Sequence, residues 1–75
     1  MEHYKNLSGD SGVVAYEIGT ESIKVQFIDG SIYLYNYQSA GKDNIERMKR
    51  LAIAGEGLSS FIGNVVKDGY ALKLR

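Results

Sequence analysis

Apolar and polar residues alternate along two neighbouring runs of the chain, which are separated by Asp29 and Gly30. An Asp-Gly pair between alternating runs is the strongest short-range signal of a β-hairpin. Gly30 is expected at positive φ, in a type I′ turn or as a bulge glycine. With a two-residue turn, Lys24 opposes Tyr35, and the hairpin has one apolar face and one tyrosine-bearing face. The predicted core face carries Ile23, Val25, Phe27, Ile32 and Leu34, and the predicted open face carries Lys24, Gln26, Tyr33, Tyr35 and Tyr37.

Residues 13–18, VVAYEI, also alternate and predict a strand before the hairpin. A four-residue loop over 19–22 places Ile18 opposite Ile23 and forms a favourable charge pair between Glu17 and Lys24. A two-residue loop keeps the same faces without that pair, whereas a three-residue loop turns Glu17 into the core. We therefore expect a three-stranded antiparallel meander with the four-residue loop.

Residues 39–54 change to the period of an amphipathic helix. Asp43 is the predicted N-cap of this helix, Glu46 is its capping-box partner, and Gly55 ends it. The stripe expected to face the sheet consists of Ile45, Met48, Leu51 and Ala52.

A second short helix is predicted after Gly57 and is expected to end near Gly69. In the tail, Leu72 and Leu74 alternate with other residues, so this segment either adds a short strand or tucks against the sheet. The predicted fold class is α+β, with the order β-β-β-α-α, and the helices must cover the apolar face of the sheet. The buried face of the second helix is expected to carry Leu58, Phe61, Ile62 and Val65.

The length of 75 residues predicts one small domain, with a packed core over about 13–70 and a loop-like segment over 1–12. The chain has no cysteine, no apolar run near the roughly 20 residues of a membrane span, and no signal-peptide segment, which predicts a cytoplasmic protein without a membrane partner. The net charge of zero argues against strong non-specific nucleic-acid binding.

Charge is nevertheless unevenly distributed along the chain. Residues 1–38 carry two lysines against five acidic residues, a net of −3, and residues 39–75 carry seven basic against four acidic residues, a net of +3. Within the second half, Arg47, Lys49 and Arg50 cluster in one helical segment. They form a candidate basic patch or, more simply, a solvated helix face.

No constellation of residues in the sequence indicates catalysis, a metal or a cofactor. The GDSG segment at 9–12 resembles the surroundings of a protease nucleophile, but the only histidine is His3, and a polar turn explains the segment better. Zinc needs three or four ligands, and the carboxylates are scattered singly. Gly55-Glu56-Gly57 precedes a helix start, yet it lacks the remainder of a phosphate-binding loop and is typical of a tight helix–helix turn.

The tyrosine-bearing face is the candidate site. Tyrosines at alternate strand positions lie about 6.5–7 Å apart, a spacing that suits the stacking of successive unpaired RNA bases. We therefore expect a non-catalytic binding module that contacts RNA. The alternative is a protein-interaction or homodimer module that uses the same face, and the tyrosines could also be covered by the tail. The expected binding residues are Tyr33, Tyr35, Tyr37, Lys24 and Gln26.

The chain resembles the KTSC domain, a small module found at the C-terminus of some lysyl-tRNA synthetases and also alone in small bacterial and phage proteins. The resemblance covers residues 13–70 and rests on a strand ending in Gly30, the central Tyr33-Leu34-Tyr35, a following helix, the AGEGL junction at 54–58, and the late aromatics Phe61 and Tyr70. It implies a small α+β fold and the RNA binding suggested for that family.

Overall fold

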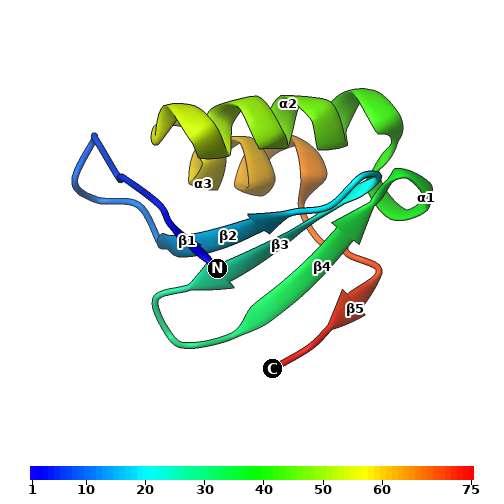
Figure 1. Ribbon diagram of the computed structural model, residues 1–75, viewed down its shortest axis with the longest axis horizontal. Helices are drawn as coiled ribbons and strands as arrows, with labels where there is room; N and C mark the ends of the chain where they lie inside the picture. The colour runs from blue at the N-terminus through cyan, green and yellow to red at the C-terminus, as the bar shows by residue number, and fades with distance from the viewer.

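All 75 residues are described in a computed structural model, in which one five-stranded antiparallel sheet is packed under a helical layer. Figure 1 shows α2 and α3 lying across one face of the sheet, while the opposite face has no cover. None of the helices is both long enough and apolar enough to span a membrane. In chain order the elements are β1 (Glu2–His3), β2 (Val13–Ile18), β3 (Ser22–Phe27), β4 (Ile32–Asn36), α1 (Tyr37–Ala40), α2 (Lys42–Ala54), α3 (Leu58–Phe61), the π-helical turn η1 (Ile62–Val66) and β5 (Leu72–Lys73).

The α+β class with an antiparallel sheet is confirmed, but the sheet is larger than the predicted three strands. The strands follow one another in the order β1-β2-β3-β4-β5, so β1 and β5 form the two edges. The tail therefore does add a strand, as one of the two alternatives expected. One core joins the sheet to the helices; its buried side chains are Tyr4, Val13, Ile23, Val25, Tyr35, Ile45, Met48, Ala52, Leu58, Ile62 and Val66.

The predicted pairing of β2 with β3 is confirmed. Ile18 opposes Ile23 and Glu17 opposes Lys24 across the four-residue loop. The Lys24 Nζ lies 3.4 Å from the Glu17 carboxylate on the open face. Strict alternation along residues 13–18 would put Val13 on the same face as Glu17. A β-bulge interrupts the register after Val13, and Val13 thereby joins the core.

The predicted register of the β3–β4 hairpin is wrong by one residue. The turn has three residues, 28–30, because the Gly30 N–H donates to the Phe27 carbonyl (2.9 Å) and the Phe27 N–H donates to the Ser31 carbonyl (2.9 Å). Gly30 has φ 89°, which confirms its expected positive φ in a turn of this kind. Val25 consequently opposes Tyr33, and Lys24 opposes Leu34.

A shift of one residue reverses both faces of β4. Tyr33 and Tyr35 share the helix-covered face with Val25 and Ile23. Ile32 and Leu34, which we expected in the core, lie instead on the open face beside Lys24 and Gln26. The prediction that the helices cover Ile23, Val25 and Phe27 is confirmed, because the first two are fully buried and Phe27 packs against them.

The strand β4 ends one residue before Tyr37, which was expected to belong to it. Asn36 accepts a hydrogen bond from the Ser39 N–H (2.8 Å), and the Ser39 hydroxyl accepts one from the Asn36 N–H (3.0 Å). This reciprocal capping box starts the short helix α1, so Tyr37 is its first residue.

The main helix, α2, buries Ile45, Met48 and Ala52 as predicted and ends at Gly55, which is left-handed with φ 81°. The expected N-cap is wrong. The helix begins at Lys42 with Gly41 before it, and Asp43 lies inside the first turn, where its charge still suits the helix dipole.

The second helix changes pitch in its middle. After α3, the N–H of Lys67 donates to the carbonyl of Ile62, five residues back, which defines the wider turn η1. The wider turn rotates the next residues, so Val66 is buried and Val65, predicted to be buried, is 52% exposed.

The segment 1–12 contributes a residue that we did not expect in the core. Tyr4 is only 1% exposed, and its hydroxyl accepts a hydrogen bond from the N–H of Leu58, the first residue of α3 (3.2 Å). This contact joins positions 54 residues apart and extends the core beyond the predicted limit at residue 13.

Candidate functional site: an aromatic cleft between the hairpin and the helical layer

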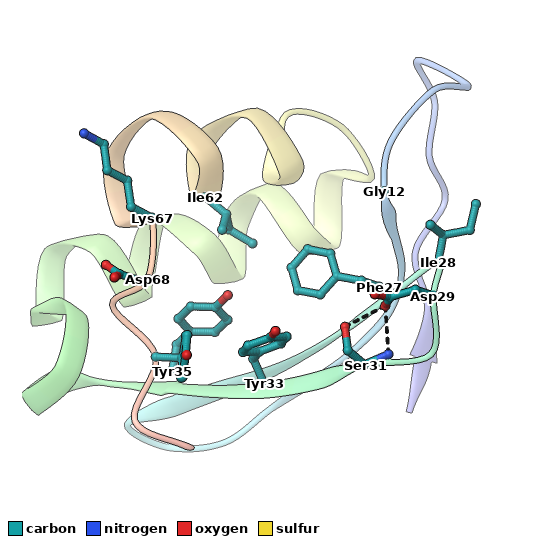
Figure 2. Close-up of a pocket in the computed structure, with 11 residues that line it drawn as sticks. Gly12, Phe27, Ile28, Asp29, Ser31, Tyr33, Tyr35, Ile62, Lys67 and Asp68 are labelled. Atoms are coloured by element: carbon teal, nitrogen blue, oxygen red, sulfur yellow. Dashed lines mark hydrogen bonds between the residues drawn. The ribbon is translucent and has the colours of Figure 1, made fainter. Parts of the chain in front are cut away.

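An opening rich in aromatic side chains, with a volume of about 440 Å³, lies between the β3–β4 hairpin and the end of η1. Figure 2 shows Phe27, Tyr33 and Tyr35 rising from the sheet toward Ile62, which points down from the helical layer. We call this opening the aromatic cleft. Its lining residues are Gly12, Phe27, Ile28, Asp29, Ser31, Tyr33, Tyr35, Ile62, Lys67, Asp68 and Tyr70.

The aromatic rings form one continuous group with Tyr33 at its centre. The Tyr33 ring meets Tyr70 edge to face with centroids 4.6 Å apart, and meets Phe27 in the same way at 5.7 Å. Tyr35 lies 6.5 Å from Tyr33 in a more nearly parallel orientation. These arrangements are favourable for aromatic pairs, so the rings hold one another in place.

Local structure brings these rings together from three parts of the chain. Tyr33 and Tyr35 lie on one side of β4 because they are two residues apart on a strand. Tyr70 reaches them because β5 returns to pair with β4, with Lys73 opposite Tyr33. The cleft therefore depends on the helical segment that connects β4 to β5 as much as on the β3–β4 hairpin.

The three tyrosine hydroxyls of the aromatic cleft make no hydrogen bond within the chain. The hydroxyls that do so belong to Tyr4 and Tyr37, outside the cleft. Tyr35 is only 2% exposed, and its hydroxyl has no hydrogen-bond partner. Because no fully buried side-chain oxygen lacks a partner, this hydroxyl is not fully buried, and Tyr35 lines the cleft. Hydroxyls in such surroundings are available to a ligand, because a phenol in an apolar setting gains by finding a partner.

Burial, together with the neighbouring Tyr33 and Tyr70, raises the pKa of Tyr35 to about 12 from its ordinary value of 10.0. The neutral phenol is thus favoured in the folded state. The stability that this preference contributes is fully present below pH 10 and is lost as pH rises through about 12. At neutral pH the hydroxyl can donate a hydrogen bond and cannot act as a phenolate.

This shift predicts a late step in an alkaline titration followed by phenolate ultraviolet absorbance. Among the six tyrosines, Tyr35 should ionise about two pH units after an ordinary phenol. The Tyr35→Phe variant should lose that late step and keep the earlier ones. Identical titration curves for the two proteins would contradict the burial of this phenol.

The rim of the cleft is polar and carries both signs of charge. Figure 2 shows the Asp29 carboxylate turned to Ser31, from which it accepts hydrogen bonds by the hydroxyl (2.6 Å) and the backbone N–H (3.0 Å). These bonds hold the pKa of Asp29 below its usual range. Lys67 has φ 54°, a backbone conformation that residues other than glycine rarely adopt. Its side chain extends away from the rings in Figure 2, next to Asp68. Such backbone strain is common at functional sites.

The structure brings together only two of the five predicted binding residues, Tyr33 and Tyr35, and it places them in the cleft rather than on an open face. Lys24 and Gln26 lie on the opposite side of the sheet, where Lys24 pairs with Glu17. The reason is the one-residue shift of the hairpin, which separates the tyrosines from the residues expected beside them.

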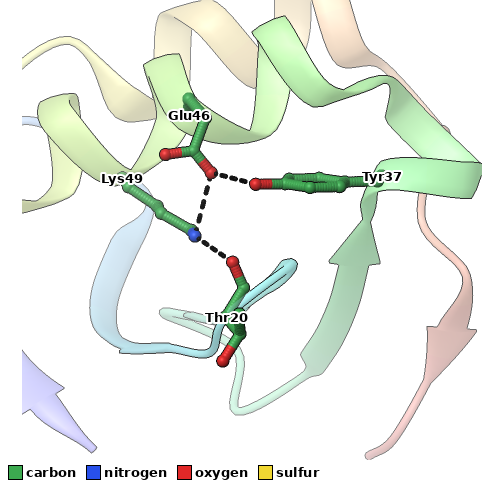
Figure 3. Close-up of polar contacts among 4 residues, drawn as sticks. All are labelled: Thr20, Tyr37, Glu46 and Lys49. Carbon is green, nitrogen blue, oxygen red and sulfur yellow. Dashed lines mark hydrogen bonds and ion pairs between the residues drawn. The ribbon is translucent and has the colours of Figure 1, made fainter.

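The fifth predicted residue, Tyr37, belongs to a polar cluster at the other end of the sheet (Figure 3). Its hydroxyl donates to the Glu46 carboxylate (2.7 Å), and Lys49 bridges the same carboxylate (2.9 Å) to the Thr20 carbonyl (2.8 Å). The bonds from Lys49 and then Tyr37 lower the pKa of Glu46. The cluster links α1 and α2 to the β2–β3 loop and is structural.

This cluster also divides the candidate basic patch. Lys49 is engaged by Glu46 and Thr20, whereas Arg47 and Arg50 are exposed. The Arg47 guanidinium lies 5.8 Å from the centre of the Phe61 ring. The three residues therefore do not present a common cationic surface, and none of them lines the aromatic cleft.

Reasoning from residues missed Phe27, Tyr70 and Asp68 as parts of the site. Phe27 was assigned only to the core, and Tyr70 was noted only as a late aromatic of the family resemblance. No group of three or more histidine, cysteine or acidic side chains lies close enough to hold a metal ion. Comparison of the chain with protein-family models, with curated proteins and with solved structures found no match.

Proposed function

We propose that this chain is a small non-catalytic binding module that takes an unpaired RNA base in the aromatic cleft. The observation that carries the proposal is the convergence of three tyrosines, all without hydrogen bonds from their hydroxyls, on one opening. Ring faces and edges provide stacking surface for a base, and the hydroxyls can bond its polar edge.

The size and composition of the cleft support a ligand with a flat ring. About 440 Å³ is within the range of roughly 300–1,000 Å³ found for small-ligand sites, which are mostly apolar with a few convergent polar groups. Tyr70 is 38% exposed, so its ring is the one most open to an incoming base. The KTSC resemblance agrees with this proposal and stays a prediction.

The proposal is tested by titrating labelled single-stranded oligouridylate at low salt with the wild type and with Tyr70→Ala. Base–aromatic stacking is worth roughly 1–3 kcal/mol per base, so the variant should bind about tenfold more weakly or worse. Tyr70 is partly exposed, and the fold should survive its truncation. A thermal melt of each variant checks this point.

Tyr37→Ala is the matched control, because it removes a tyrosine of the same size from the polar cluster rather than from the cleft. It should lower stability modestly and leave RNA affinity unchanged. Equal losses of affinity in Tyr70→Ala and Tyr37→Ala, or no binding by the wild type at low salt, would contradict the proposal.

A second candidate function, protein interaction or homodimerisation without nucleic acid, is favoured by the open face of the sheet. Leu72 is exposed there and pairs with Leu34, while Ile32 lies on the same face two residues earlier on β4. If this candidate is right, the wild type does not bind oligouridylate at all. The titration described above therefore separates the RNA-binding function from the protein-interaction function.

A further inference from the structure

A second recess adjoins the aromatic cleft at the tip of the hairpin. It has a volume of about 340 Å³ and shares Asp29 and Ser31 with the cleft, so the two openings lie side by side. We call it the basic recess; its lining residues are Asp29, Gly30, Ser31, Lys73 and Arg75. Asp29, Gly30 and Ser31 lie between β3 and β4, Lys73 lies in β5, and Arg75 lies two residues after it.

The two openings differ in charge. At the rim of the cleft, Lys67 stands with two carboxylates, Asp68 and the shared Asp29, which leaves a side-chain charge of −1. In the basic recess, Lys73 and Arg75 face the single carboxylate of Asp29, which leaves a net charge of +1. The ion pairs of the structure are Lys24–Glu17 and Lys49–Glu46, so neither Lys73 nor Arg75 is paired with Asp29. The charge of Lys73 nevertheless contributes to lowering the pKa of Asp29, so the two groups lie in the same recess.

Tyr33 connects the recess to the rings. The Lys73 Nζ lies 5.8 Å from the centre of the Tyr33 ring, on the helix-covered side of the sheet. The same ring lines the cleft and contacts Tyr70. A cation therefore stands directly beside the aromatic surface on which a ring would stack.

We infer that the ligand is a phosphorylated nucleoside, whose base enters the aromatic cleft and whose phosphate lies in the basic recess against Lys73 and Arg75. The inference rests on the proposed function and adds to it the group that binds beside the base. An apolar opening lined by aromatic rings, beside a recess that carries two cations, complements a ligand with a flat neutral ring and an anionic end. A free nucleotide and a residue of an RNA strand share this chemistry.

The inference is tested by calorimetric titration with uridine, uridine 5′-monophosphate and inorganic phosphate. The monophosphate should bind about tenfold more tightly than uridine, because charge-assisted hydrogen bonds are the stronger kind. Arg75→Gln and Lys73→Gln should each reduce that advantage and leave the affinity for uridine unchanged. Lys73→Arg should restore it, and Lys42→Gln, at an exposed lysine of α2, should have no effect.

Equal binding of uridine and its monophosphate, or equal losses of both in Lys73→Gln and Arg75→Gln, would overturn this inference and leave the proposed base site standing. If neither uridine, the monophosphate nor oligouridylate binds, both proposals fail. A four-residue oligouridylate that binds more tightly than the monophosphate identifies a strand as the source of the nucleotide. Equal affinity identifies a free nucleotide, and either result supports the recess as its phosphate site.

Discussion

Val25→Asp is expected to unfold the domain. Val25 lies in the central strand β3, fully buried, between its cross-strand neighbours Tyr16 and Tyr33. No buried charged side chain lies in this core to pair with a carboxylate. An unpaired buried charge costs several kcal/mol, while a chain of this length has only about 4–11 kcal/mol of total stability.

Circular dichroism and urea denaturation measure the effect, and Gln26→Asp is the matched control. Gln26 is the next residue of the same strand but lies on the open face, where a carboxylate stays in water. The control should keep a cooperative transition. A Val25→Asp protein that melts within a few degrees of the wild type would show that this face is not the core.

Tyr4→Ala is expected to have the next largest effect on stability. Truncating a buried aromatic side chain to alanine costs about 3–5 kcal/mol through lost burial and the cavity left behind. Tyr4→Phe keeps the ring and leaves only the Leu58 N–H without its partner, so its loss should be about 1–3 kcal/mol. The ordering of these two variants separates packing from hydrogen bonding.

The free energies of unfolding can be compared in urea, with Leu7→Ala as the control. Leu7 lies three residues further along the same segment, is exposed, and should be within about 0.5 kcal/mol of the wild type. Similar small losses in Tyr4→Ala and Leu7→Ala would mean that the N-terminal segment does not complete the core.

The register of β2 and β3 could be predicted because two independent requirements agreed. The four-residue loop aligned the apolar residues and also placed Glu17 opposite Lys24, as the structure shows. The buried face of α2 could also be predicted, since its apolar residues recur at helical spacing and Gly55 follows them. Local pattern sufficed where two independent signals in the sequence pointed to the same arrangement.

The register of β3 and β4 could not be predicted in the same way. Asp29-Gly30 fits a two-residue turn and also a three-residue turn closed by a glycine at positive φ. The strand β4 reads Ile-Tyr-Leu-Tyr, so both of its faces are apolar and neither identifies itself as the core. In the structure, the Ser31 hydroxyl and N–H both donate to the Asp29 carboxylate and hold the turn together, a contact that the apolar pattern does not indicate.

The aromatic cleft could not be predicted from the pattern of neighbouring residues. Its rings come from residues 27–35 and from Tyr70, and β5 must pair with β4 before they meet. Tyr4 had no periodic neighbours that would mark it as buried. The capping box of Asn36 and Ser39, by contrast, was readable in the sequence and would have ended β4 before Tyr37.

The three-residue turn at 28–30 also sets how the chain can vary in length. Its tip includes Ile28 and Asp29, both exposed, and exposed loop tips are where insertions and deletions are usually tolerated. Deleting Ile28 would leave Asp29-Gly30 as a two-residue loop with Phe27 still opposite Ser31, so Tyr33 and Tyr35 would keep their face of the sheet. The aromatic cleft therefore constrains the pairing of Phe27 with Ser31 and not the number of residues between them, so the length of this tip can vary without changing which side chains of β4 face the helices.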